Sequence, residues 1–306
     1  MEQENLVKYP LVSIITINYN GADVTCELLE SLRKVTYPNM EVIVVDNASK
    51  ENPDVIQERY PEVELIKNPK NEGFAGGNNV GFRAAKGKYF MVLNNDTEVH
   101  PNFLQPLVAK LESDPIAGAV SSKLIYYNTE GVIQYAGSSM INPYTGRSSF
   151  VGQKEVDNGQ YDVCCLTHYA HGAAMMVPRK VVEEVGLMAD LYFLYYEELD
   201  FCERIKGAGY SIWYIGNSEV YHKESMSVGK QNPLKTYYMT RNRLVYMRRN
   251  VKGIKLMISM AFFFMLAVPK HTLVHLKSRR LDLLSAFYRG VYWNFVNHKI
   301  FDNPKI

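Results

Sequence analysis

The segment Leu11-Val-Ser-Ile-Ile-Thr-Ile17 is an unbroken run of mostly β-branched residues. Three similar runs follow at residues 42–46, 63–66 and 89–93. Such runs are typical of strands that are buried on both faces of a parallel sheet. Segments with helical spacing, such as residues 75–86, lie between them. Alternating strands and helices predict a doubly wound α/β domain with a mostly parallel central sheet.

Polar side chains collect directly after three of these runs. The sequences there are Asn18-Tyr-Asn-Gly21, Asp46-Asn-Ala-Ser49 and Asn94-Asn-Asp-Thr97. Ligands of such sheets bind beyond the carboxyl ends of the strands, so we expect the binding site there. Asp96 stands where a carboxylate often anchors a hard cation together with substrate phosphate oxygens. The alternative for Asp96 is a helix cap or a turn residue.

A glycine-rich stretch, Asn71-Glu-Gly-Phe-Ala-Gly-Gly-Asn-Asn-Val-Gly81, precedes one of the predicted helices. Backbone N–H groups at such a position can bind a phosphate. The glycine spacing differs from the GxGxxG pattern of dinucleotide-binding folds. A tight loop with close helix packing is the alternative interpretation.

Three carboxylates crowd the aromatic stretch Tyr195-Tyr-Glu-Glu-Leu-Asp-Phe-Cys-Glu-Arg204, at Glu197, Glu198 and Asp200. Crowded acids beside apolar rings raise one another's pKa, which suits a general base, and we favour Glu198 for that role. For Asp200 we favour an ion pair with Arg204, at i, i+4 spacing on a helix. His222 follows a strand-like segment and is a weak metal-ligand candidate by itself, whereas His168 and His171 are interpreted as structural.

Charge is distributed unevenly along the chain. The 306 residues carry a formal net charge of +2 and are 47% hydrophobic. From Lys235 onward there are 14 basic residues and only two acidic ones, so this tail carries +12 and the preceding part −10. A basic tail predicts contact with a polyanion, either phospholipid or nucleic acid. The pattern past Pro233 is helical to the end, with a break expected near Pro269. The apolar run 256–268 ends there, short of the ~20 residues that span a bilayer, so we expect it to lie on a membrane.

The four cysteines suit neither a zinc site nor a disulfide framework, because their only close spacing is the pair Cys164-Cys165. We expect a reducing, cytoplasmic compartment. The polar, acidic first residues lack the basic start and apolar stretch of a signal peptide.

Taken together, these motifs resemble the family-2 glycosyltransferases of the GT-A fold, closest to the rhamnosyltransferase-like branch that builds bacterial surface polysaccharides. The resemblance spans roughly residues 12–249 and is carried by the three polar strand ends, the glycine-rich stretch, Gly172-Ala-Ala-Met-Met-Val-Pro178, the acidic segment and Arg241-Asn242. It implies a catalytic domain over residues 1–232, with a donor half to about residue 100 and an acceptor half beyond. Residues 233–306 would form a basic helical extension.

The resemblance also implies roles for single residues. Asp96 would hold Mg²⁺ or Mn²⁺ with His222, and Glu198, beside Glu197, would be the base. The family has an Asp at the position of the general base, where this chain has Glu198. It often has an acidic residue where this chain has Asn94, so the chain departs from the pattern twice. Two residues are expected to contact the nucleobase of the donor, Thr16 and Asp46. The residues expected to contact other parts of the nucleotide sugar are Asn18, Asn71, Asn79, Asn95 and Arg241.

The predicted reaction is transfer of one sugar, with inversion, from dTDP-rhamnose or a UDP-sugar to a hydroxyl of a saccharide or lipid-linked saccharide. We expect the enzyme to lie on the inner face of the cell membrane, against anionic lipid, with no nucleic acid partner. The alternatives are a sugar-phosphate nucleotidylyltransferase and an inactive nucleotide-sugar-binding module. A nucleotidylyltransferase would usually carry basic residues after its first strand, and Asn18-Tyr-Asn-Gly21 has none.

Overall fold

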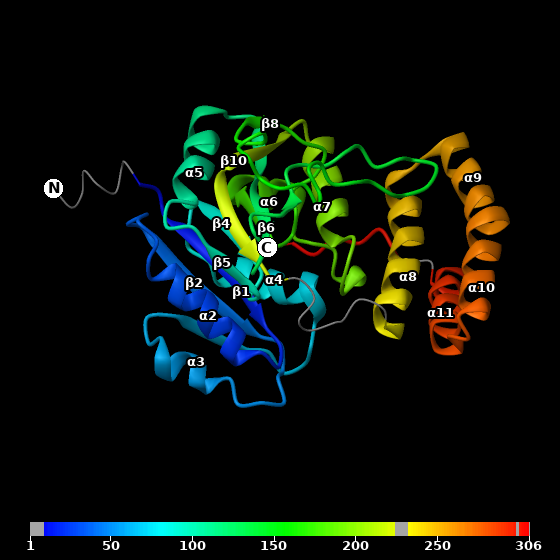
Figure 1. Cartoon of the computed structure of the whole chain (residues 1–306), viewed down its shortest axis with the longest axis horizontal. Helices are drawn as coiled ribbons and strands as arrows, with labels where there is room; N and C mark the ends of the chain where they lie inside the picture. Colours follow the sequence, from blue (N-terminus) through cyan, green and yellow to red (C-terminus); the bar gives the residue numbers. More distant parts are fainter. Residues whose placement is uncertain (1–8, 224–231, 298–299, 306) are drawn as a thin grey trace.

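The computed structural model describes residues 9–223, 232–297 and 300–305. Its first half forms a parallel sheet in the order β3-β2-β1-β4, with helices between the strands (Figure 1). The strands are β1 (Val12–Asn18), β2 (Met40–Asp46), β3 (Glu64–Lys67) and β4 (Tyr89–Leu93). The helices are α2 (Ala22–Leu32), α3 (Asp54–Arg59) and α4 (Gly73–Ala84). The predicted α/β fold is confirmed.

The second half extends the same sheet with strands of mixed direction. Strand β9 pairs antiparallel with both β4 and β6, and β6 pairs parallel with β10. The short strands β5, β7 and β8 all pair antiparallel with their neighbours. The added elements are β5 (Thr97–Val99), α5 (Leu104–Ser113), β6 (Ala117–Tyr126), β7 (Ile133–Tyr135), β8 (Cys164–Leu166), β9 (Ala174–Pro178), α6 (Arg179–Val185), η1 (Asp190–Tyr192), α7 (Glu197–Gly207) and β10 (Ser211–His222).

Alternation along the central strands builds one apolar core on each face of the sheet. Ile14 and Met91 pack with α2 and α5, whereas Ile15 and Phe90 pack on the opposite face with α4, α6 and α7. Successive strand residues point to opposite faces, so an unbroken apolar run fills both cores. The run at residues 63–66 was expected to be buried in the same way, and this expectation is wrong. It forms β3 at the edge of the sheet, where both ends of the strand are exposed.

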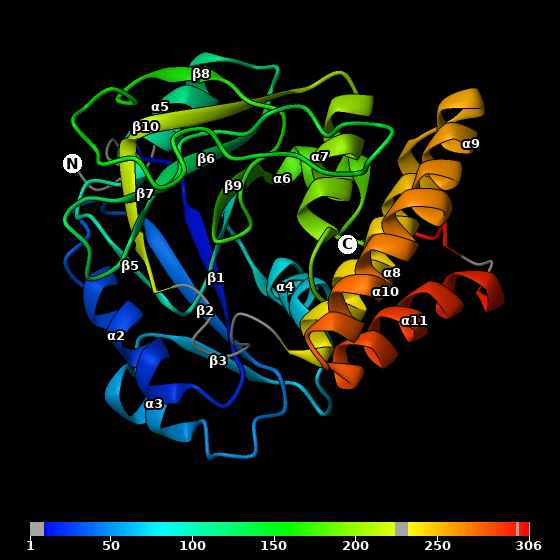
Figure 2. The same ribbon diagram turned by 45° about the vertical axis from the view of Figure 1, so that its right-hand side comes forward.

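The C-terminal helices are α8 (Pro233–Asn250), α9 (Gly253–Phe262), the π-helical turn η2 (Phe263–Ala267), α10 (Val268–Lys277) and α11 (Leu281–Val296). Figure 2 shows α9, α10 and α11 beside α8 on the side away from the sheet. Val245, Tyr246 and Met247 of α8 belong to the apolar core that covers α7. We expected a domain boundary near residue 233, but the apolar packing between α7 and α8 continues across it.

The predicted break at Pro269 is not present. Helical structure runs without interruption from Gly253 to Lys277, and the π turn lies directly before the proline. A proline ring clashes with the carbonyl four residues earlier, here Met265, and the wider π turn relieves that clash. The resulting 25-residue helix is long and apolar enough to cross a membrane by length and composition, and only 17% of its most apolar window is buried.

Asp200 joins α7 to the C-terminal helix α8. This fully buried carboxylate accepts hydrogen bonds from Arg249 Nε at 2.7 Å, Arg204 Nε at 3.2 Å and Asn250 Nδ2 at 3.0 Å. The expected Asp200–Arg204 pair is present, with Arg249 as a second cation. Burial alone would raise the pKa of Asp200, but the hydrogen bond and charge of Arg249 outweigh it, so the pKa is lowered.

Asp200→Asn should destabilise the fold by ~3–5 kcal/mol at neutral pH, because it leaves two buried arginines without a counter-charge. A lowered pKa means that this stabilisation is complete above the unfolded-state pKa of ~3.9 and is lost as the pH falls through the folded-state value. Urea unfolding across pH 3–7 measures both effects. Asp282→Asn, in the exposed Arg280–Asp282 pair, is the control and should change stability little. Equal stabilities of the Asp200 variant and the wild type would contradict the assignment.

Candidate active site

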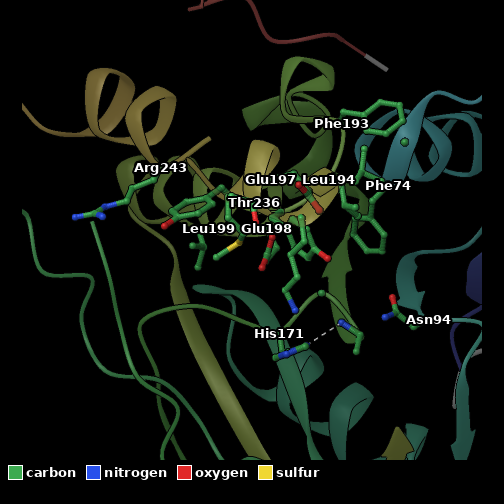
Figure 3. A pocket seen from close by; sticks show the side chains of 18 of the residues that line it. Phe74, Asn94, His171, Phe193, Leu194, Glu197, Glu198, Leu199, Thr236 and Arg243 are labelled. Atoms are coloured by element: carbon green, nitrogen blue, oxygen red, sulfur yellow. Dashed lines mark hydrogen bonds between the residues drawn. The ribbon is translucent and has the colours of Figure 1, made fainter. Parts of the chain in front are cut away.

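A cavity of about 1290 Å³ opens at the carboxyl ends of β1 and β4 and extends to the C-terminal helices. We divide its lining into three zones. The strand-end zone comprises Tyr19, Asn20, Gly21, Asn47, Asn71 and Asn95; the central zone comprises Asn94, Asp96, His171, Glu197, Glu198 and His222; and the helical zone comprises Arg147, Arg243, Phe263, His271, Val274 and His275. In Figure 3 the two glutamates lie between Asn94 on one side and Arg243 on the other.

Asp96 and His222 meet in the central zone, although 126 positions separate them. His222 Nε2 lies 3.1 Å from Asp96 Oδ1 and 3.3 Å from Asn94 Nδ2. His222 Nδ1 lies 2.7 Å from Gln134 Oε1, which can only accept, so Nδ1 carries a proton and Nε2 faces the carboxylate. Burial opposes the charge on Asp96, but the hydrogen bond from His222 outweighs it and lowers the pKa.

This donor set fits a divalent cation. An imidazole nitrogen and a carboxylate oxygen that lie 3.1 Å apart at the wall of one cavity can act together as ligands of a cation. A metal-binding histidine commonly donates its other N–H to an oxygen that fixes its orientation, as His222 does to Gln134.

Glu197 and Glu198 begin α7 and line the cavity, with Glu197 buried and Glu198 partly exposed. Oε2 of each side chain is buried without a hydrogen-bond partner within the described part of the chain. Burial raises the pKa of Glu197 well above its ordinary value, and the neighbouring Glu198 adds to the shift. Burial also raises the pKa of Glu198, to about 7. A carboxyl that titrates near neutral pH is suited to accept a proton in a reaction.

The loop that leads into this pair is strained. Phe193, Tyr195 and Tyr196 have φ angles of 63°, 70° and 76°. Each such non-glycine residue costs about 1–3 kcal/mol and persists only where the surroundings hold it. Asn242 stabilises this loop conformation, because its Nδ2 donates to the carbonyls of Tyr192, Leu194 and Tyr195, each at 2.8 Å.

Arg241 supports the same loop from α8. Its Nη2 donates to the carbonyls of Leu191 and Tyr192, and its Nε donates to Asn242 Oδ1 at 2.7 Å. The side chain is buried and does not line the cavity. We therefore assign Arg241 a positioning role in place of the predicted donor contact.

Several of the other predicted donor residues lie behind the cavity wall. Asp46 accepts from Asn18 Nδ2 at 2.7 Å and from Ser49 Oγ at 2.5 Å, and Asn18 accepts from Thr25 Oγ1 at 3.0 Å. Neither Asp46 nor Asn18 is among the lining residues. Together with Ser49 and Thr25, they form a polar network under the strand-end zone and can shape it without touching a ligand directly.

Of the remaining predictions, Asn71 and Asn95 line the cavity. Asn79 does not, because its amide nitrogen donates to Met188 O at 2.8 Å and its oxygen accepts from Met188 N at 3.0 Å. Thr16 is fully buried, and its hydroxyl has no hydrogen-bond partner among the described residues. The contacts with a donor remain predictions for Asn71 and Asn95, while Asn79 positions α4 against η1.

A second acidic group, formed by Asp157, Asp162 and Glu219, has the spacing of a metal site. The ammonium group of Lys123 already occupies its centre, at 2.6 Å from Asp157, 2.6 Å from Asp162 and 3.1 Å from Glu219. The lysine is 1% exposed, and despite that burial its three carboxylate partners raise its pKa. An ammonium group therefore already takes the central position that a metal ion would need.

Three further residues were not recognised in the sequence as site residues. His171 was interpreted as structural, yet it lines the central zone with its ring 6.2 Å from that of His222. Burial and the neighbouring His222 lower the pKa of His171 to about 3, so it is neutral. Gln134 orients His222, and Arg243 lines the helical zone. The only sequence signal was the polar His171 directly before the apolar run of β9.

The sheet, the strand-end cavity and the Asp96–His222 pair define a nucleotide-sugar-binding domain of the GT-A type. The family model described as glycosyl transferase family 2 matches residues 13–186, more than half of the chain. The chain belongs to this family.

Individual relatives are distant. The chain is 25% identical to a low-salt glycan biosynthesis hexosyltransferase of Haloferax volcanii, over 76% of this chain and 74% of that protein. It is 28% identical to an uncharacterized glycosyltransferase of Rickettsia typhi, over 58% of this chain and 53% of that protein. It is also 28% identical to an uncharacterized protein of Sinorhizobium fredii, over 79% of this chain and 28% of that protein. The chain thus spans about half or less of the length of some curated relatives.

The fold is shared with solved structures. A mannosyltransferase from Pyrobaculum calidifontis, solved with GDP-Man and Mn²⁺, aligns with a TM-score of 0.58 at 17% identity. The alignment covers 95% of this chain and 76% of that one, so it includes the C-terminal helices.

Proposed function

We propose that this protein is an inverting, metal-dependent glycosyltransferase that moves one sugar from a nucleotide diphosphate sugar to an acceptor hydroxyl. The observation that carries the proposal is the single cavity that brings the Asp96–His222 pair beside the buried Glu197–Glu198 pair. The first pair suits a diphosphate-bound cation, and the second suits deprotonation of a hydroxyl. Departure of the diphosphate and deprotonation of the acceptor hydroxyl would then take place in one cavity.

The residues of the cavity divide the chemistry between them. Glu198 accepts the proton of the attacking hydroxyl, and the neutral His171 lines the space beside it. Attack from the side opposite the leaving diphosphate inverts the anomeric carbon. Asn71 and Asn95 face the donor from the strand-end zone. Asp96 and His222 would hold Mg²⁺ or Mn²⁺, which supplies positive charge to the departing diphosphate.

The rival interpretations have less support. Membership of the glycosyltransferase family disfavours a sugar-phosphate nucleotidylyltransferase. An inactive binding module would have no need to bury an unpartnered oxygen on each of two adjacent carboxylates, since such atoms are costly to the fold. The donors that we propose are dTDP-rhamnose or a UDP-sugar, in the assembly of a bacterial surface polysaccharide.

Two features support a site of action at the inner face of the cell membrane. The Gly253–Lys277 helix exposes apolar side chains, among them Ile254, Met257 and Met265, each more than 60% exposed. Lys277 and Arg279 lie at its end. Within α11, Phe287 and Val291 pack inward, whereas Leu281, Tyr288 and Phe295 are exposed. Exposed apolar residues flanked by basic ones favour binding to anionic lipid.

Asp96→Ala and His222→Ala should each abolish the Mn²⁺-dependent part of UDP binding, because each removes one side of the proposed cation site. Isothermal titration with Mn²⁺ and then with EDTA measures this dependence. Asp162→Asn is the matched control, since it alters the acidic cluster around Lys123 and should leave UDP binding intact. UDP binding that is equal in EDTA and in Asp96→Ala would show that no metal acts at this site.

The rate of sugar transfer should rise with pH through about 7, because Glu198 must lose its proton before it can act as a base. Glu198→Gln should lower kcat by ~10² or more and keep donor affinity. Release of nucleoside diphosphate from dTDP-rhamnose and from UDP-sugars is the assay. Glu184→Gln, on the exposed surface of α6, is the control and should keep full activity. If only Glu197→Gln lost activity, the general base would be Glu197 and not Glu198.

Flotation with liposomes tests the membrane proposal. Binding should strengthen with anionic lipid and weaken with salt, and the double variant Lys277→Glu/Arg279→Glu should bind at least ~10-fold less, since each basic residue contributes ~1 kcal/mol. Lys34→Glu/Arg59→Glu makes the same charge change beside α2 and α3 and should float like the wild type. A wild type that stays unbound with every lipid mixture would refute membrane docking.

A further inference from the structure

The helical zone of the cavity contains a buried arginine that the proposed donor chemistry does not use. Arg243 is 5% exposed and lies over the ring of Phe263, 5.1 Å from its centre. Its Nε donates to Thr145 O at 2.6 Å. The other two guanidinium nitrogens have no hydrogen-bond partner, and no carboxylate lies within ion-pair distance, among the residues that the structure describes.

Two donor nitrogens of this guanidinium are therefore free to bind an anion in the cavity. The contrast with Arg204 and Arg249 is direct, because both of those arginines share the carboxylate of Asp200. Burial lowers the pKa of Arg243 to about 10, and the neighbouring Arg147 also lowers it. Arg243 remains charged at neutral pH and faces the cavity.

The polar side chains around Arg243 in the helical zone are a second arginine and two histidines, with no acidic residue among them. Arg147 is exposed on the loop between β7 and β8, with its Nη2 3.4 Å from His271 Nε2. His275 lines the same zone. The acids that line the whole cavity are Asp96, Glu197 and Glu198, all in the central zone. The helical zone is therefore a pocket for an anion.

The geometry places this pocket next to the reacting centre. Tyr196, which directly precedes the glutamate pair, donates from its hydroxyl to Gly146 O at 3.1 Å, and Gly146 adjoins Arg147. One acceptor molecule can thus present a hydroxyl to Glu198 and an anionic group to Arg243. Asn94 lies on the other side of the glutamates (Figure 3), and His222 contacts both Asn94 and Asp96, so the proposed site of the donor diphosphate is on that side.

The pocket also continues onto an apolar surface. Val274 lines the helical zone and is 51% exposed on α10. Leu273 and Leu276 are exposed on other sides of the same helix, since at 100° per residue they point away from the side on which Val274 lines the pocket. A ligand whose phosphate is bound by Arg243 can therefore extend a hydrocarbon chain past Val274 and reach the apolar surface of this helix or the bilayer beside it.

We propose that the helical zone binds the phosphate or diphosphate of a lipid-linked saccharide acceptor, with Arg243 and Arg147 on the phosphate oxygens and the lipid along the exposed face of α10. This assignment rests on the proposed transferase function, because it names the acceptor class of the same cavity. Guanidinium groups suit phosphate because their forked N–H donors match its oxygens.

Farnesyl diphosphate, used below its micelle concentration, is a probe for this pocket. Binding is measured by isothermal titration in EDTA, without nucleotide, so that the Asp96–His222 site holds no cation. The wild type should bind the probe, and Arg243→Met should weaken binding at least ~10-fold, because it removes the charge and keeps the volume. Arg147→Ala, at an exposed position that tolerates change, should weaken binding several-fold. Arg289→Ala on the outer surface of α11 is the control and should bind like the wild type.

Competing probes identify the chemistry. The lipid-phosphate assignment expects farnesyl diphosphate to bind more tightly than either farnesol or inorganic diphosphate. Equal binding of inorganic diphosphate would overturn the lipid part and favour a phosphate-bearing polymer as acceptor. Equal binding of farnesol, or unchanged affinity in both arginine variants, would overturn the phosphate pocket.

Binding of UDP with Mn²⁺ is measured on the same variants. Arg243→Met should keep it, which shows that the fold and the donor side are intact. A wild type that binds farnesyl diphosphate but no nucleotide would sink the proposed function and leave the phosphate pocket standing. The opposite result would sink the pocket alone.

Discussion

The burial of two adjacent carboxylates at the start of α7 is the constraint on which the rest of the site depends. Oε2 of each carboxylate is buried without a hydrogen-bond partner among the described residues, and burial of the two groups raises the pKa of both. Such a pair also needs a rigid frame, since a mobile loop would let water reach it. The frame is the strained segment Phe193–Tyr196, which Asn242 and Arg241 hold through its backbone carbonyls.

This frame explains why the C-terminal helices and the sheet form one unit. Asn242 and Arg241 lie on α8, so the helix after the catalytic domain supports the catalytic loop. Asp200, three residues after Glu197, accepts from Arg249 further along the same helix. The helix therefore fixes both the loop before α7 and the first turn of α7 itself. The remaining face of α8 provides Arg243 to the cavity and packs against α11. One helix thus links catalysis, stability and the acceptor side.

Much of the fold followed from simple patterns in the sequence. Apolar runs that alternate with helical spacing predicted the sheet, and the rule that ligands bind at strand ends predicted the position of the cavity. The sequence could not show which polar side chains face the cavity. Asn18 and Asp46 stand at strand ends as predicted, yet they bond to each other behind the wall. Tertiary contacts over long separations decide this, as for His222 with Gln134 and Asp96.

The C-terminal region illustrates a second limit. Proline ordinarily ends a helix, and a break at Pro269 was a sound expectation. The π turn at Phe263–Ala267 removes the clash, and single-sequence patterns carry no signal for such a turn. The difference matters for function, because an uninterrupted helix of 25 residues exposes a longer apolar surface than the predicted short run. Arg241 shows the same limit at the level of one residue, since only packing reveals that its guanidinium faces inward.

Direct titration of the two carboxyl groups tests the central claim most directly. The protein can be labelled with ¹³C at the glutamate side-chain carboxyls, and comparison of spectra of the wild type with Glu197→Gln and Glu198→Gln identifies the two signals. In the ligand-free protein the account predicts that Glu198 titrates near pH 7 and that Glu197 stays protonated to a higher pH. Two signals that titrate near the ordinary glutamate pKa of ~4.3 would show that the pair is solvated, and the account of the site would be wrong.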